Sequence, residues 1–200
     1  MAIKINLQQT EKVLFCSSKW WGDPDMPPEM EYPMVADTED GEEYPMTFLC
    51  QINCEDLYEY DKEGRLPHEG MLYFFAAADG CLGYDAPYDS PEGEWSKGRI
   101  KVKYTKTVNF ETFNSFIMVD DNDEAVTEPA LEMTFSTCNE EYGGLCLLGK
   151  FMDGSSLSLL EVDGKEKMIG FTEKGSLHFT ISENDLKFMN FNKVKGYFKK

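Results

Sequence analysis

Residues 47–53 read Thr-Phe-Leu-Cys-Gln-Ile-Asn, and residues 69–75 read Glu-Gly-Met-Leu-Tyr-Phe-Phe. A similar order of strand, polar strand end, glycine and second strand returns near the other end of the chain. There, residues 157–163 read Leu-Ser-Leu-Leu-Glu-Val-Asp, and residues 174–180 read Lys-Gly-Ser-Leu-His-Phe-Thr. These segments predict two related strand–loop–strand modules, an internal pseudo-repeat over residues 47–75 and 157–180.

The two modules align at their polar and glycine positions. The aligned pairs are Gln51 with Glu161, Asn53 with Asp163, and Gly70 with Gly175. A glycine at this place permits the positive φ from which a second strand can start. Coincidence is the alternative, because hairpins resemble one another and the two loops differ in length.

The rest of the chain also favours strands. Residues 71–78 are apolar on both faces, which is typical of a central strand covered on both sides. Residues 99–105 alternate apolar and polar side chains and predict a half-buried strand. Residues 1–18 fit a short helix or strand, and residues 185–199 fit a strand pair or a helix. Without a clean linker, we expect one mainly β domain over residues 1–200 with a few short helices.

The charge balance limits the kinds of partner. The chain has 37 acidic and 19 basic residues, for a net charge of −18. Phosphate contacts need Lys or Arg, so this charge argues against nucleic acid and against anionic membrane surfaces. It favours association with a basic partner, although many cytoplasmic proteins are acidic for solubility alone.

Neither a signal peptide nor a membrane span is visible in the sequence. Residues 1–14 lack a basic region followed by an apolar core, and no apolar run approaches ~20 residues. We therefore expect a cytoplasmic location. The cysteines should then be thiols and mostly small core residues; they are Cys16, Cys50, Cys54, Cys81, Cys138 and Cys146.

Several stretches resemble the YwqG-like proteins, a domain of unknown function. Residues 18–24 (SKWWGDP) are similar to the family's "SKFGGxP", and residues 48–53 (FLCQIN) match its "FLxQIN". Residues 66–75 (LPHEGMLYFF) match "LPxxGLLYFF". Residues 147–149 (LLG) and 175–179 (GSLHF) fit the family's "LLG" and its terminal "GxLYFF". The resemblance runs in order along nearly the whole chain.

This resemblance implies a mainly β roll built from two related halves, and it implies no reaction. The family's "WGDxG" before the last strand is missing, because residues 170–175 read Gly-Phe-Thr-Glu-Lys-Gly. The family's Trp-Pro is Tyr32-Pro33 here. Any role of the missing Asp is therefore in doubt in this chain.

The motifs that could carry chemistry are incomplete. Residues 144–150 approach a P-loop, but Phe151 stands where Ser or Thr is needed, so we expect a buried strand. Residues 120–124 are acidic, yet they lack the EF-hand spacing and indicate a solvated turn. Cys50 and Cys54 with a distant His68 do not make a zinc site. With no nucleophile elbow or dinucleotide motif, we predict no catalytic residue, no metal and no cofactor.

Polar groups near aromatic residues remain as candidates for ligand or partner binding. Gln51 and Glu161 lie within apolar strands, where a polar group needs a partner. If the two modules face each other, these groups line a shared crevice, with aromatic and basic residues at its border. The alternative is that both are structural hydrogen bonders and that the Trp pair is core. The candidate residues are Lys19, Trp20, Trp21, Gln51, Asn53, Tyr73, Glu161 and Asp163.

Two hypotheses for function follow. The favoured one is an acidic immunity-type or accessory protein that binds a basic protein partner. The alternative is a small-ligand or carbohydrate-binding domain, or a hydrolase, that uses Glu161 and Asp163 at the seam between the modules; two carboxylates ~5–9 Å apart can act as acid and base. The sequence leaves the oligomeric state open.

Overall fold

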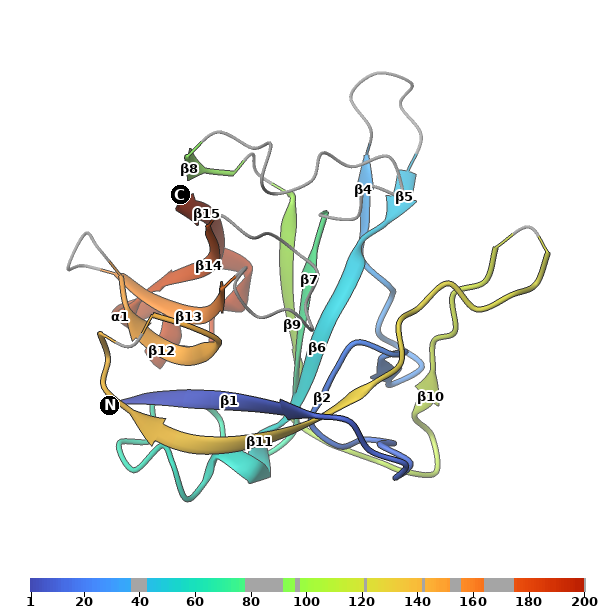
Figure 1. Ribbon diagram of the computed structural model, residues 1–200, viewed down its shortest axis with the longest axis horizontal. Coiled ribbons are helices and arrows are strands. Elements are labelled where there is room, and N and C mark those ends of the chain that lie inside the picture. Colours follow the sequence, from blue (N-terminus) through green and yellow to red (C-terminus); the bar gives the residue numbers. More distant parts are fainter. Residues whose placement is uncertain are drawn as a thin grey trace.

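The fold is a large antiparallel sheet that curls until its two halves pack together (Figure 1). The computed structural model describes residues 1–36, 43–77, 92–95, 98–120, 122–141, 143–151, 156–163 and 175–199. Within these residues the main sheet has 11 strands, in the order β8-β15-β14-β13-β12-β1-β11-β2-β6-β7-β9. Two small sheets pair β10 with β3 and β4 with β5.

The strands differ widely in length. Those of the main sheet are β1 (Ala2–Gln8), β2 (Lys19–Trp20), β6 (Thr47–Asn53), β7 (Met71–Ala76), β8 (Gly93–Glu94), β9 (Ile100–Thr105), β11 (Leu131–Cys138), β12 (Cys146–Lys150), β13 (Ser156–Asp163), β14 (Ser176–Ser182) and β15 (Lys195–Lys199). The others are β3 (Asp25–Met26), β4 (Met34–Ala36), β5 (Glu43–Pro45) and β10 (Asn114–Ser115). The short helices are η1 (Cys54–Leu57), α1 (Glu183–Lys187) and η4 (Phe191–Lys193).

The strands of the main sheet are arranged almost symmetrically about its centre. On one side, β11 continues into β2, β6, β7 and β9; on the other, β1 continues into β12, β13, β14 and β15. β1 and β11 pair with each other in the middle, and each lies beside the half to which it does not belong in sequence. The two halves therefore exchange their first strands, and strands of both join one sheet.

The strand register repeats between the halves. Gln51 pairs with Tyr73, and Glu161 pairs with His178 at the corresponding place. Each long strand also has one extra residue at the same point, between Phe48 and Cys50 in β6 and between Ser158 and Leu160 in β13. The two segments that are alike in sequence thus also have the same strand pairing, including a β-bulge at the same position. The bulge bends the strand at that point.

The apolar inner faces of the two halves form one core. The rings of Phe74 in β7 and Phe179 in β14 meet edge to face with centroids 5.4 Å apart. Both rings are fully buried and belong to the cluster that holds Trp20 and Phe198. Because successive strand residues face opposite sides, Gln51 and its counterpart Glu161 face outward, away from this core.

The outer face of the first half carries a second apolar layer. Met71, Tyr73 and Phe75 of β7 are buried there against Met26 and Phe113. β7 is thus covered on both faces and lies between β6 and β9. The prediction of a central strand starting at residue 71 is confirmed, and so is the mainly β fold.

Other predicted segments resolve as follows. Residues 1–18 contain a strand, β1, and residues 185–199 divide between the end of α1, η4 and β15. The near miss to a P-loop is the buried strand β12. Cys16, Cys50, Cys54, Cys138 and Cys146 form no disulfide within the described residues, and Cys81 lies outside them.

The two aligned glycines share a close contact with the third strand of their halves. A Cβ on Gly70, which has φ +82°, lies 2.0 Å from the carbonyl oxygen of Thr105 in β9. A Cβ on Gly175 lies 2.5 Å from the carbonyl oxygen of Lys199 in β15. Only a residue without a side chain fits where these backbones approach.

We predict that Gly70→Ala destabilises the protein by about 3 kcal/mol or more, since a backbone carbonyl blocks the new methyl group. Gly64→Ala is the matched control. Gly64 has φ +60° with no atom within 4 Å of a Cβ, so it should cost only about 1 kcal/mol of backbone strain. Urea unfolding measures both, and equal losses would contradict the argument.

Candidate functional site

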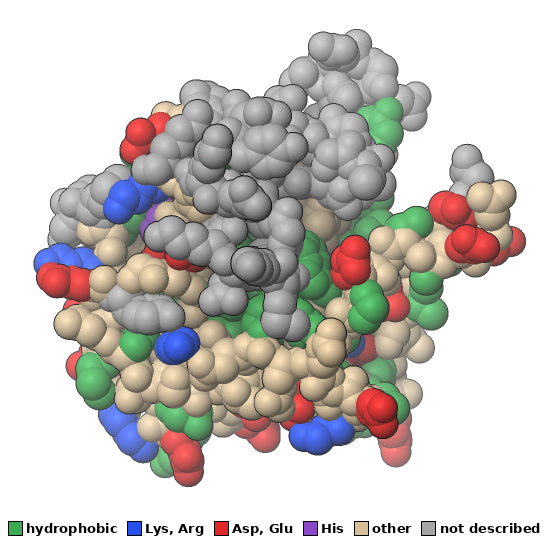
Figure 2. Space-filling model, viewed as in Figure 1, with side chains coloured by type: hydrophobic (Ala, Val, Ile, Leu, Met, Phe, Trp, Pro, Cys, Tyr) green, Lys and Arg blue, Asp and Glu red, His purple; other side chains and the backbone are tan. Residues whose placement is uncertain are grey.

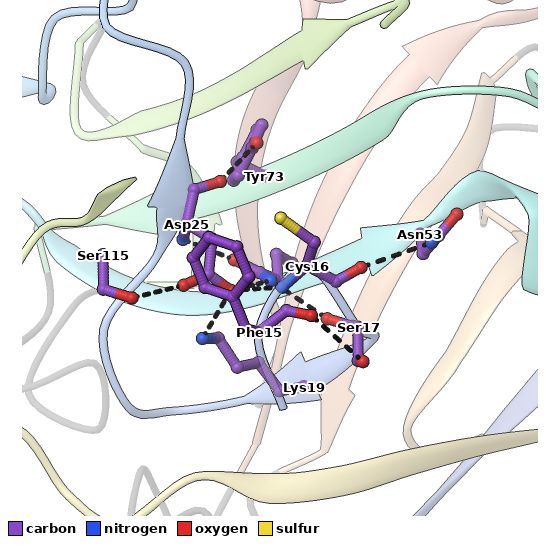
Figure 3. Close-up of polar contacts among 9 residues, drawn as sticks. Phe15, Cys16, Ser17, Lys19, Asp25, Asn53, Tyr73 and Ser115 are labelled. Atoms are coloured by element: carbon purple, nitrogen blue, oxygen red, sulfur yellow. Dashed lines mark hydrogen bonds and ion pairs between the residues drawn. The ribbon is translucent and has the colours of Figure 1, made fainter. Parts of the chain in front are cut away.

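A buried carboxylate, Asp25 in β3, is the centre of the polar cluster in the first half (Figure 3). Its Oδ2 atom accepts hydrogen bonds from the backbone N–H of Cys16 (2.8 Å), from Lys19 Nζ (2.8 Å) and from Gln51 Nε2 (2.7 Å). Its Oδ1 atom accepts from Ser115 Oγ at 2.6 Å. The carboxylate thus has a cation and three other donors, which is what a buried charge requires.

The backbone of Asp25 is held as firmly as its side chain. Its N–H donates to Gln51 Oε1 at 2.8 Å, and its carbonyl accepts from the Tyr73 hydroxyl at 2.7 Å. Gln51 Nε2 also donates to the carbonyl of Ser17 at 3.0 Å. Burial and the nearby Cys16 and Asp25 raise the pKa of the Tyr73 hydroxyl well above its usual value. Gln51 and Tyr73 therefore dock β3 onto β6 and β7.

Asn53 connects this cluster to the helical turn that follows β6. Its side-chain Nδ2 donates to the carbonyl of Cys16 at 3.2 Å, and its Oδ1 caps η1 by accepting from the N–H of Glu55 at 3.1 Å. Its own N–H donates to Ser18 Oγ, which donates in turn to Asp56 Oδ2 at 2.6 Å. Asn53 thus fixes the start of η1, and Ser18 positions the Asp56 carboxylate.

The tryptophans serve the core. Trp20 is fully buried, and its ring lies 5.7 Å from the ring of Trp21, which packs half-buried against the same cluster. Of the predicted binding residues, Lys19, Gln51 and Tyr73 contact one group that the sequence did not single out, and Asn53 bonds to Cys16 beside it. That group is Asp25, and its only signal was an acidic residue between prolines in an ordered segment.

Glu161 and Asp163 lie in the other half, on the outer face of β13. The structure does not bring them to Gln51, because the two halves touch through their inner faces. Glu161 is 8% exposed; its Oε1 accepts from the N–H of Gly144 at 3.2 Å, and its Oε2 lies 3.9 Å from Cys146 Sγ. In place of the Lys19 ammonium, this half has a cysteine beside its carboxylate.

His178 faces Glu161 across the strand pair and is held by two serines. Ser158 Oγ lies 3.0 Å from Nδ1 and donates to the carbonyl of Leu160 at 3.1 Å, so the N–H is on Nδ1. Ser176 Oγ, 2.8 Å from Nε2, then donates to that nitrogen. Burial lowers the pKa of His178 to about 4, so the ring is neutral at pH 7.

The Glu161 carboxyl has the opposite shift. Burial, together with the negative charge of Asp163, raises its pKa to about 7, against the opposing effect of the Gly144 N–H. The nearest nitrogen of His178 is 3.9 Å from Oε2, too far for a hydrogen bond. With a neutral ring and a carboxyl that is about half protonated near pH 7, this buried cluster carries less charge than an ionised carboxylate would give it.

A groove of about 840 Å³ lies beside η1, between that turn, residues 12–14 and β11. Its acidic lining residues are Glu55, Asp56, Glu59 and Glu132. Tyr58 also lines it and is 66% exposed, with its ring edge to face against His68 at 5.3 Å. Within the described residues, Glu132 alone of these four has a cation, Lys12 Nζ at 2.7 Å. The groove is therefore acidic and partly aromatic.

Metal ligands do not gather in the described part of the chain, where no group of three or more His, Cys, Asp or Glu side chains could hold an ion. Asp120, in the acidic turn, accepts hydrogen bonds from the N–H groups of Asn122 and Glu124. No helix in the described residues is long and apolar enough to cross a bilayer.

Residues 18–146 match a family described as Domain of unknown function (DUF1963), which covers more than half of the chain. The chain belongs to this family. The DUF1963 match includes Lys19, Asp25, Gln51, Tyr73 and Ser115 of the buried cluster. A comparison with curated proteins gives no match.

We predict that Asp25→Asn destabilises this DUF1963 protein by about 3–5 kcal/mol, because it leaves the buried Lys19 ammonium without its charge partner. Ser115→Ala, which removes one donor at the edge of the cluster, should cost about 1 kcal/mol. The free energy of unfolding in urea measures both. A variant Asp25→Asn as stable as wild type would contradict a structural role.

The pKa values of Glu161 and His178 predict a pH effect. The pKa of Glu161 is raised from 4.5 to about 7. Its contribution to the free energy of unfolding is therefore full below pH 4.5 and is lost as the pH rises to about 7. The pKa of His178 is lowered from 6.5 to about 4, so its contribution to the free energy of unfolding is full above pH 6.5 and is lost as the pH falls to about 4. Between pH 4.5 and 6.5 the two oppose each other.

In the variant Glu161→Gln, the pH dependence of stability that His178 causes should no longer be cancelled. Relative to wild type, the variant should gain stability with pH, by up to about 1.4 kcal/mol per unit between pH 4.5 and 6.5. His178→Gln should shift in the opposite direction. Unfolding midpoints at pH 4.5, 5.5 and 6.5 measure this; parallel pH profiles for all three proteins would contradict the opposing contributions.

Proposed function

We propose that this protein binds a basic segment of a protein partner in the groove beside η1. The observation that carries the proposal is the acidic lining of that groove around an exposed tyrosine ring. Within the described part of the chain, no Lys or Arg pairs with Glu55, Asp56 or Glu59. Asp56 accepts from Ser18, so the charges of Glu55 and Glu59 are the ones available to a ligand. Lys and Arg side chains of the partner would pair with these carboxylates.

The arrangement around Tyr58 suits a long cationic side chain. The rings of Tyr58 and His68 meet edge to face, and Tyr58 remains 66% exposed. A Lys or Arg that stacks on an exposed aromatic face gains roughly 0.5–1 kcal/mol, and its head group can reach a neighbouring carboxylate. Glu55 and Glu59 flank the tyrosine in sequence and line the same groove.

The charge of the whole chain supports the same kind of partner. A net charge of −18 attracts a basic protein over distances of roughly a Debye length, and it raises the rate of encounter at low salt. Asn53 and Ser18 hold η1 in place before any ligand arrives. A preorganised acidic groove loses less conformational entropy on binding than a flexible loop.

A cytoplasmic location and the YwqG-like resemblance are parts of the same proposal. Five described cysteines that form no disulfide with one another, four of them buried, suit a reducing compartment. The equal register of the two halves supports the two-module roll that the resemblance implies. The carboxylates Glu161 and Asp163 are on the outer face of the second half, so the seam between the modules offers no support for a hydrolase.

We predict that Glu59→Lys weakens binding of a fluorescent Lys-Arg hexapeptide at least fivefold, because it places a cation in the groove. Glu183→Lys, on exposed α1, makes the same change of charge elsewhere and should have less than a twofold effect. Fluorescence anisotropy at about 50 mM salt measures both. Equal effects of the two variants would contradict the groove and leave only net charge as the cause.

Tyr58 separates the aromatic contribution from that of the carboxylates. Tyr58→Phe should bind the hexapeptide nearly as well as wild type, whereas Tyr58→Ala should bind it about two- to fivefold more weakly. If wild type fails to bind the hexapeptide at low salt, the proposed function itself is wrong.

A further inference from the structure

A narrow two-stranded arm projects from the body of the protein beyond β10 (Figure 1). Residues 116–120 and 122–126 run side by side. Val119 forms a β-bridge with Ala125, and the N–H of Val126 donates to the carbonyl of Met118 at 3.1 Å. An isolated pair of strands of this size gains little stability from its own contacts.

The arm is apolar where it meets solvent. Phe116 is 45% exposed, Ile117 60%, and Val119 and Val126 50% each. Hydrophobic atoms lie along the arm in the space-filling view, with acidic atoms near its far end (Figure 2). Several exposed apolar side chains on one projecting element are typical of a site that another protein covers.

The root of the arm is fixed to the body. The ring of Phe116 stacks on Tyr32 with centroids 4.5 Å apart, and Tyr32 meets the buried Phe75 edge to face at 5.3 Å. The N–H of Phe116 donates to the carbonyl of Pro24, and Ser115 donates to Asp25. The arm is therefore presented at a defined angle, which lowers the entropy lost on docking.

The charge of the arm indicates which kind of protein binds it. Residues 116–127 contain Asp120, Asp121, Asp123 and Glu124 and no Lys or Arg. Two copies of this arm would bring like charges together, and each whole chain has a net charge of −18. A second copy is therefore disfavoured, and a partner with basic residues around an apolar cleft is favoured.

A pocket of about 340 Å³ lies between the root of the arm and the groove beside η1. Ser115 and Thr127, at the root of the arm, line it together with Lys12, Val13 and Leu14. These last three residues also line the acidic groove, and Val13 is 90% exposed. The groove and the root of the arm are therefore adjacent.

We propose that the groove and the arm form one interface for one basic protein, with the arm seated in an apolar cleft of the partner and the groove holding its cationic side chains. The inference rests on the proposed function of the groove. A stable complex covers roughly 800 Å² on each partner, more than a peptide-sized groove provides, and the arm supplies apolar area to it. The arm adds affinity by burial, and the groove adds orientation by charge.

The test compares two synthetic peptides. The first is the Lys-Arg hexapeptide, which is long enough for the groove alone. The second adds to it a 14-residue extension of alternating Lys and Val, which can pair with the arm and cover its apolar side chains. A version with Glu in place of every Lys serves as the charge control. Anisotropy gives the dissociation constant of each peptide for each variant.

Ile117→Ser with Val119→Ser removes apolar area from the arm, and Phe188→Ser with Met189→Ser removes exposed apolar side chains elsewhere. We expect the arm variant to bind the long peptide about tenfold more weakly and the hexapeptide unchanged. The control pair should bind both as wild type does. Unchanged thermal unfolding establishes that each variant is folded.

Three results would overturn the inference while leaving the groove intact. These are an arm variant that binds the long peptide as wild type does, a Glu-containing peptide that binds as tightly as the Lys-containing one, and a wild-type dimer that the arm variant converts to a monomer in sedimentation. Failure of the hexapeptide to bind wild type at all is a separate result, which rejects the groove first and the shared interface with it.

Discussion

The buried carboxylate of Asp25 is the interaction on which most of the first half depends. A charge without access to water is stable only when cations and N–H or O–H donors surround it. Those donors come from the segment before β2, from β2 itself, from β6 and from β10. One side chain thus links the segment around Cys16 and Lys19 to β6 and to β10, the strand from which the projecting arm extends.

The two halves have the same backbone arrangement but different buried polar side chains. The register, the bulge and the glycine contact repeat, because they depend on strand geometry and on close approach of backbones. The side chains at the repeated outer positions do not: Lys19 and Gln51 correspond to Cys146 and Glu161. The first half has an ion pair, whereas the second has a carboxyl of raised pKa beside a neutral histidine.

The surface of the molecule divides in a similar way. The polar groups of both clusters are occupied by internal partners, so they contribute to stability and to the placement of loops. The groups that remain available to a ligand lie beside them, on η1 and on the arm. Both features are held in place by the Asp25 cluster, through Asn53 on one side and Ser115 on the other. Stability and recognition are therefore separate tasks of neighbouring residues.

The sequence by itself determined the strands, the doubled module and the acidic charge. These are properties of local alternation and composition: a short apolar run such as β7, bounded by glycine, favours a strand covered on both faces, and the alignment of Gln51 with Glu161 rests on similar strand sequences. What those residues do was decided by tertiary structure. Asp25 lies 26 residues before Gln51 and 90 before Ser115, and no local pattern relates them. Whether a polar side chain is a structural donor or is available to a ligand depends on which distant group the fold places within about 3 Å of it.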